Sequence, residues 1–212
     1  MIALDAATLI EHGRPVLNGA SFDFTPGIWH VAEERAGDAR LLIDMLAGHR
    51  LPVAGAVRCA GARSWPLSRT APFGFALSGL DMIDALASLY ALDRRATVRL
   101  FVAMMPEVDW LSARFDRWPQ RLQRRFGHVA LLAPAFDIYL LDVSPVLPER
   151  DFYERWRALF ETRIAGKTVV MASGDHRAAL RDFPGMRLTL ARGALHRAEP
   201  AAERAPPAMA AE

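Results

Sequence analysis

The stretch Phe136-Asp137-Ile138-Tyr139-Leu140-Leu141-Asp142 decides the fold of this 212-residue chain. Isoleucine, tyrosine and leucine in one short run, closed by an aspartate, predict a buried parallel strand with a carboxylate at its carboxyl end. Open α/β sheets bind ligands and metals at that edge. We therefore predict that Ile138–Leu141 is an interior strand of a mainly parallel sheet, and that Asp142 is a candidate site residue.

The segments on either side of this stretch complete a βαβ unit. Residues 122–134 predict a helix that leads into the strand, and residues 151–164 predict a second helix after it. The run Thr168-Val169-Val170-Met171-Ala172-Ser173 is a second short apolar strand. Strands that alternate with helices in this way are typical of α/β proteins with a parallel sheet.

The rest of the chain predicts short strands before this unit, a helical insert, and a terminal hairpin. The insert spans about residues 78–130, with breaks near 93–95 and at Pro106. A helix over residues 41–48 ends on Gly48, a fitting helix stop. The expected strands are residues 1–9 (an edge strand), 20–24, 28–32, 55–58, 187–191 and 194–196.

Composition narrows the class of protein. Hydrophobic residues make up 52% of the chain and charged residues 24%, which fits a globular domain. No apolar run reaches the roughly 18 residues that a membrane-spanning helix needs. A net charge of +2 gives no indication of nucleic-acid binding. The single cysteine, Cys59, excludes an intrachain disulfide and suits the cytosol. Residues 198–212 predict a disordered tail.

The order of these elements resembles an ATP-binding subunit of an ABC transporter, in particular those of capsular polysaccharide exporters. The resemblance rests on Gly55-Ala56-Val57-Arg58 followed by Ser64-Trp65-Pro66-Leu67, and on the two strands of the βαβ unit. It covers about Ile2 to His196. The resemblance implies a P-loop NTPase-like domain over residues 1–197, with an antiparallel β portion at its start and a helical subdomain over about 78–130.

The same resemblance implies partners and a location. These subunits dock on a polytopic membrane subunit and pair as a homodimer or as a heterodimer with another ATPase subunit. The expected place is therefore the cytoplasm, peripheral on the inner face of the cell membrane, with no nucleic-acid partner.

The segment at the P-loop position, residues 33–41, lacks the groups that bind ATP. A P-loop needs glycines whose N–H groups cradle phosphates, a lysine for the β- and γ-phosphates, and serine or threonine for magnesium. This segment has one glycine, Gly37, and no lysine. Counting forward from the preceding turn places Arg40 at the lysine position, and counting back from the end of the following helix places Ala39 there.

Three acidic residues in this segment, Glu33, Glu34 and Asp38, add negative charge beside a phosphate site. Gly37 and Arg40 are the residues that remain as a vestigial P-loop. Arg40 is either a phosphate contact or a solvated arginine at a helix start.

The only lysine of the chain, Lys167, lies in a misleading motif. Gly166-Lys167-Thr168 copies the end of a P-loop but precedes a strand, whereas a P-loop lysine opens a helix. We interpret Lys167 as a solvated loop residue.

The other positions that the resemblance marks have also changed. The stacking aromatic expected near Leu9 to Glu11 is absent, and Val143 stands where the general-base glutamate would follow Asp142. The remaining changed positions are Gly74 for the magnesium-contacting glutamine, Trp118 to Leu122 for the Ser-Gly signature, and Gly174 for the switch histidine, with His176 two residues later.

Asp142 is then a vestigial metal residue or a structural cap for a neighbouring helix or loop. We predict no catalytic residue and no required cofactor, with at most weak binding of ATP and magnesium. Trp110, Trp118 and Trp156 are interpreted as helix-packing residues.

The sequence favours a non-hydrolysing structural or regulatory subunit of a polysaccharide exporter. The alternatives are an active ATPase with atypical motifs and a soluble binding module outside transport.

Overall fold

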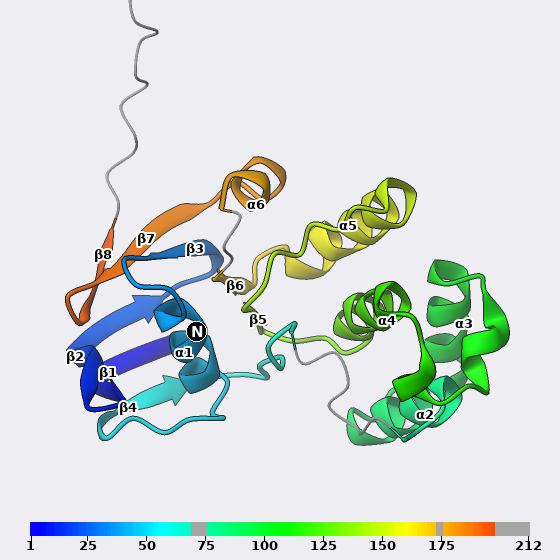
Figure 1. The fold of residues 1–212 in the computed structure, drawn as a ribbon, viewed down its shortest axis with the longest axis horizontal. Coiled ribbons are helices and arrows are strands. Elements are labelled where there is room, and N and C mark those ends of the chain that lie inside the picture. The colour runs from blue at the N-terminus through cyan, green and yellow to red at the C-terminus, as the bar shows by residue number, and fades with distance from the viewer. Residues whose placement is uncertain (69–75, 173–175, 198–212) are drawn as a thin grey trace, which may run out of the picture.

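The computed structural model describes residues 1–68, 76–172 and 176–197, except the side chains of residues 108 and 176 (Figure 1). The elements follow in the order β1 (Ile2–Glu11), β2 (Arg14–Phe24), β3 (Gly27–Glu33), α1 (Asp38–Leu46), β4 (Ala54–Cys59), α2 (Gly79–Leu89), α3 (Arg94–Met104), η1 (Val108–Leu111), η2 (Phe115–Arg117), α4 (Gln120–Leu132), β5 (Ile138–Leu141), α5 (Arg150–Ile164), β6 (Thr168–Met171), α6 (His176–Asp182), β7 (Met186–Ala191) and β8 (Ala194–Arg197).

The strands form two sheets. One is antiparallel with the order β2-β1-β4, and the other has the order β5-β6-β3-β7-β8, in which only β8 runs antiparallel to its neighbour. The prediction of a mainly parallel sheet with an antiparallel portion at the start of the chain is confirmed. The prediction that residues 1–9 form an edge strand is wrong, because β1 pairs on both sides.

The prediction that Ile138–Leu141 lies in the interior of its sheet is also wrong. β5 ends the strand order, although all four of its residues are buried. Its outer edge is covered by an extended segment: Ser64 N–H donates to the Ile138 carbonyl (2.8 Å) and Leu140 N–H donates to Ser64 Oγ (2.9 Å). The covering segment excludes water from β5 as a neighbouring strand would. An edge strand that is covered in this way is therefore as apolar as an interior strand, and its sequence predicts an interior position.

The helical segment between β4 and β5 in the sequence has the predicted breaks. α3 begins after Asp93, whose carboxylate accepts the Ala96 N–H at 2.6 Å, and it ends at Met104, two residues before Pro106. α2 begins at a capping box made by Ser78 and Asp81. Helices α2 to α4 together occupy Gly79–Leu132 and lie to one side of the strands in Figure 1. The limits of the helical subdomain and of the whole domain stay predictions.

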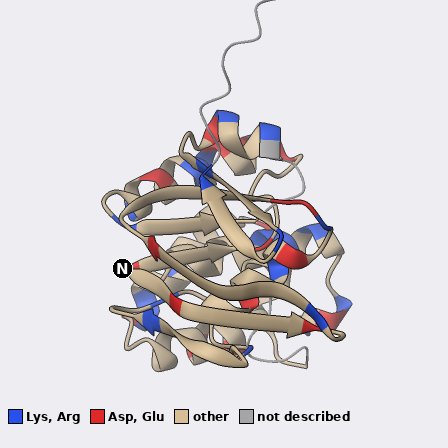
Figure 2. Ribbon diagram, turned by 90° about the vertical axis from the view of Figure 1, so that its left-hand side faces the viewer, with Lys and Arg blue, Asp and Glu red and all other residues tan. Residues whose placement is uncertain are grey.

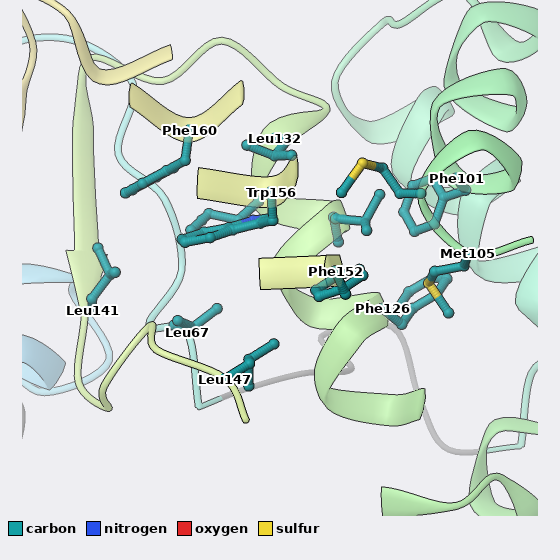
Figure 3. Packing of buried hydrophobic residues seen from close by; sticks show 14 of the residues in the cluster. Leu67, Phe101, Met105, Phe126, Leu132, Leu141, Leu147, Phe152, Trp156 and Phe160 are labelled. Atoms are coloured by element: carbon teal, nitrogen blue, oxygen red, sulfur yellow. The ribbon is translucent and has the colours of Figure 1, made fainter. Parts of the chain in front are cut away.

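Two hydrophobic clusters hold the elements together. One packs β1, β2, β3 and α1, and the other fills the space between β5 and the helices. In the second cluster, Trp156 and Phe160 stack with ring centroids 4.6 Å apart (Figure 3). Trp110, Trp118 and Trp156 are all buried there, so their interpretation as helix-packing residues is confirmed. The predicted disordered tail lies outside the described residues.

Candidate functional site

The candidate site lies where β3 and β5 end, because parallel strands of one sheet present their carboxyl ends at the same edge. β3 ends at Glu33 and is followed by a short loop and the amino end of α1. β5 ends one residue before Asp142. The fold therefore places the loop of residues 34–37 and the Asp142 carboxylate at the edge that the sequence predicts.

The loop between β3 and α1 is closed on a carboxylate of the chain itself. Gly37, the residue that caps α1, has a left-handed backbone (φ 93°). Its N–H donates to Glu33 Oε1 at 3.0 Å, and the Ala39 N–H donates to Glu33 Oε2 at 2.7 Å. Sequence reasoning treated Glu33 only as added negative charge, and no local pattern indicated that its side chain turns back onto the loop.

Asp38, the first residue of α1, forms an ion pair with an arginine from β2. Arg14 donates to both carboxylate oxygens of Asp38, at 2.9 and 2.5 Å, and Asp38 is buried. This hydrogen bonding raises the pKa of Arg14. A cavity of about 490 Å³ lies beside the pair and is also lined by Glu34, Arg35 and Arg192.

Asp142 caps a loop and meets Arg40. The Ser68 N–H donates to Asp142 Oδ1 at 2.7 Å, and the Ser68 hydroxyl donates to Oδ2. Arg40 Nε lies 3.7 Å from Oδ2, and only 1% of the Asp142 side chain is exposed. Both carboxylate oxygens are thus engaged by groups of the chain, as expected for a structural cap.

These residues do not fit ATP with magnesium as they stand. The N–H groups at the amino end of α1 that would face a phosphate include Gly37 and Ala39, which donate to Glu33. Asp142 is the strand-end carboxylate that would face a magnesium ion, and it is held by Ser68 and Arg40. Among the described residues, no group of three or more His, Cys, Asp or Glu side chains is placed to hold a metal.

Lys167 lies at the opposite edge of the sheet. It precedes β6, as predicted, and its Nζ donates to Asp137 Oδ1 at 2.9 Å. This hydrogen bond lowers the pKa of Asp137. The interpretation of Lys167 as a solvated residue is therefore wrong in one respect: the residue is in a loop, but it is ion-paired, with 36% of its side chain exposed.

The other predicted positions are distributed around the fold. Trp118 is buried against Phe126, and Pro119 caps the amino end of α4, so a bulky side chain and a proline lie at the position that the resemblance marks for the Ser-Gly signature. Glu11, at the end of β1, pairs with Arg50 at 2.5 Å. Gly74 and Gly174 lie outside the described residues, as does the side chain of His176.

The fold is that of an ABC ATP-binding cassette. The dimeric ATP-binding cassette MJ0796, solved in a post-hydrolysis state with ADP and Pi, superposes with a TM-score of 0.74 at 14% identity, covering 94% of this chain and 98% of that one. A structure described as the ATP binding subunit of an ABC transporter gives a TM-score of 0.71 at 13% identity, covering 93% and 90%.

By sequence, the chain resembles ATP-binding proteins of capsule polysaccharide exporters. It is 25% identical over 190 residues to the capsule polysaccharide export ATP-binding protein CtrD of Neisseria meningitidis serogroup B, covering 88% of this chain and 86% of CtrD. It is 24% identical over 189 residues to the ATP-binding protein BexA of Haemophilus influenzae, with the same coverage. No family model matches the chain. Within the described residues, no helix is both long and apolar enough to cross a membrane.

Proposed function

We propose that this protein is a non-hydrolysing ABC-type subunit that serves a polysaccharide exporter as a structural or regulatory component. The similarity to the capsule polysaccharide export protein CtrD supports the export role, and the cassette fold supports assembly as a dimer on a membrane subunit. The proposed place is the cytoplasmic face of the cell membrane. Acidic and basic residues are interspersed along the ribbon in Figure 2, which gives no support to a nucleic-acid partner.

The observation that carries the proposal is the position of the only lysine. Phosphoryl transfer depends on cationic groups positioned at the phosphates. Lys167 precedes β6 and pairs with Asp137, which precedes β5, whereas the candidate loop lies beyond the other ends of these strands. Asp142 follows Asp137 by five residue steps along β5, roughly 16 Å at 3.3 Å per residue. The ammonium group is thus bound at the wrong edge of the sheet.

The position after Asp142 supports the same proposal. Val143 follows it directly, and an aliphatic side chain offers no acceptor for the proton of an attacking water. An ATP-dependent exporter that contains this subunit then takes its ATP turnover from another subunit.

Two measurements test the proposal. The purified protein is assayed for magnesium-dependent ATP hydrolysis, and it is tested for co-purification with a polytopic membrane subunit of a polysaccharide exporter. We expect no turnover above the background of a mock preparation and a stable complex in detergent. Turnover would contradict the non-hydrolysing role, and failure to associate would favour a binding module outside transport.

One contact favours the alternative of an active ATPase with atypical motifs. That alternative uses Arg40, Asp142 and His176, and the first two are brought within 3.7 Å of each other. If hydrolysis is found, Arg40→Ala and Asp142→Asn must each abolish it. Turnover that survives both substitutions indicates a contaminating ATPase.

A further inference from the structure

Two charged side chains of this chain lie at the edge where open α/β sheets bind their ligands. The Glu33 carboxylate lies on the backbone N–H groups of the loop, and the Arg40 guanidinium lies beside the strand-end carboxylate of Asp142. The first is an anion at a position that suits a phosphate, and the second is a cation at a position that suits a divalent metal.

The contact of Glu33 is bidentate. Each of its oxygens accepts a different N–H, at 3.0 Å from Gly37 and at 2.7 Å from Ala39. Ionised acceptors form the stronger class of hydrogen bond, and the amino end of a helix favours negative charge. The neighbouring Glu34 is exposed, and no hydrogen bond or ion pair of its carboxylate is present among the described residues. The loop N–H groups are therefore bound by the Glu33 carboxylate alone, and not by the acidic residues of this segment in general.

The second contact joins Arg40 to the carboxylate of Asp142. Asp142 is almost fully buried, and an unpaired buried carboxylate is unfavourable. Ser68 supplies two neutral donors to it, and within the described residues Arg40 is the only cationic side chain that forms an ion pair with it. The guanidinium remains 59% exposed, so the pair lies at the rim of the site.

We propose that these contacts form a built-in autoinhibitory plug, in which Glu33 and Arg40 take the places of a phosphate and a divalent cation. The plug holds the loop and the first turn of α1 in a ligand-closed form without nucleotide. This inference rests on the proposed function, because a subunit that holds this form permanently has no need of ATP turnover.

Tethering makes the plug hard to displace. A group on the same chain acts at an effective concentration in the millimolar range or above, so a free anion must outcompete Glu33 before it reaches the N–H groups. The Gly37 and Ala39 donors are not lost from the fold, only occupied. Removal of the Glu33 carboxylate should expose them.

The test uses inorganic pyrophosphate as the probe and Glu33→Ala as the variant. Glu34→Gln is the matched control, because it removes one negative charge from the adjacent residue without touching the loop donors. Glu33→Gln is a milder variant that keeps the side-chain length if Glu33→Ala does not fold. Binding is followed by calorimetry and by the melting temperature, with sodium chloride added to equalise ionic strength.

We expect Glu33→Ala to melt at a lower temperature than the wild type and to regain stability with pyrophosphate, at an affinity at least about tenfold above that of the wild type and of Glu34→Gln. Equal affinity in all the proteins, or no gain in either Glu33 variant, would overturn the plug. Since pyrophosphate binding involves no ATP turnover, such a failure leaves the proposed function to the hydrolysis assay.

Discussion

The aromatic core beside the helices and the loop edge of the sheet are stabilised in different ways. In the core, Trp156 is fully buried, stacks on Phe160 and donates its indole N–H to the His128 carbonyl at 2.8 Å. At the loop edge, carboxylates are held by polar partners: Glu33 by the loop N–H groups, and Asp142 by Ser68 and Arg40.

This difference shows that the interactions that stabilise the fold are not the ones that determine the chemistry of the loop edge. The core depends on buried apolar area, which is non-directional and tolerates change in surface groups. The loop edge depends on individual polar contacts, each of which can be exchanged without altering the sheet. This is why the cassette fold persists while the residues at the carboxyl edge of its sheet pair among themselves. The following substitutions test that separation.

The largest effect is expected in the core, for Trp156→Ala. We expect a loss of about 3–5 kcal/mol in the free energy of unfolding, because the substitution removes a fully buried ring and leaves a cavity. Urea denaturation followed by circular dichroism measures it. Leu159→Ala on the same helix is the control, since Leu159 is 43% exposed and should change stability little. Equal losses in the two variants would contradict the packing described here.

A smaller effect is expected at the loop edge, for Ser68→Ala. Its hydroxyl donates to the buried carboxylate of Asp142, and a hydrogen bond to a charged group contributes about 1.5–3 kcal/mol. We expect a loss in that range with an unchanged far-UV spectrum, measured by the same denaturation. Ser88→Ala, at an exposed position near the end of α2, should be neutral. A neutral Ser68→Ala would show that Asp142 does not depend on the Ser68 hydroxyl.

The next smaller loss of stability is expected at a helix cap, which lies outside the aromatic core and the loop edge. Ser78 caps α2 through the Asp81 N–H, and loss of such a cap costs about 1 kcal/mol. We expect Ser78→Ala to lower stability by that amount, whereas Ser78→Asn should retain most of it because asparagine also caps helices. Hydrogen exchange of the first turn of α2 locates the effect, and exchange that rises elsewhere first would argue against the cap.

The smallest effect is expected at the amino edge of the sheet, for the exposed pair Lys167–Asp137. The pair lowers the pKa of Asp137 and raises that of Lys167. Its contribution is therefore present between the ordinary pKa values of the two groups, about 4 and 10, and is lost below and above that window. Lys167→Met should lower the melting temperature slightly at pH 7 and not at pH 2, and Lys167→Arg should preserve it. An equal change at both pH values would exclude the ion pair as its cause.

Local patterns predicted most of the elements. Apolar runs located β5 and β6, Asp93 and Pro106 bracketed α3, and Arg192-Gly193 located the final turn. Patterns failed where a strand's neighbours had to be known. β1 is central and β5 is terminal in their sheets, and the apolar content of a strand reports burial without telling which element provides it.

The sequence by itself determined which residue types stand at given positions along the chain. It established that the loop after β3 has no lysine, that Val143 follows Asp142, and that the only lysine precedes a strand. These statements need no coordinates, because they depend on residue type and order alone.

Only the tertiary structure decided how the charged residues at those places are paired. Arg40 and Asp142 are far apart in the sequence and meet because β5, β6 and β3 share one sheet edge. Glu33 is close to Gly37 in the sequence, yet its contact depends on a left-handed backbone at Gly37 that turns the loop N–H groups toward it. Hydrogen bonds and ion pairs act over a few ångströms with strict direction, so their partners are set by strand register and loop geometry, which residue type alone does not specify.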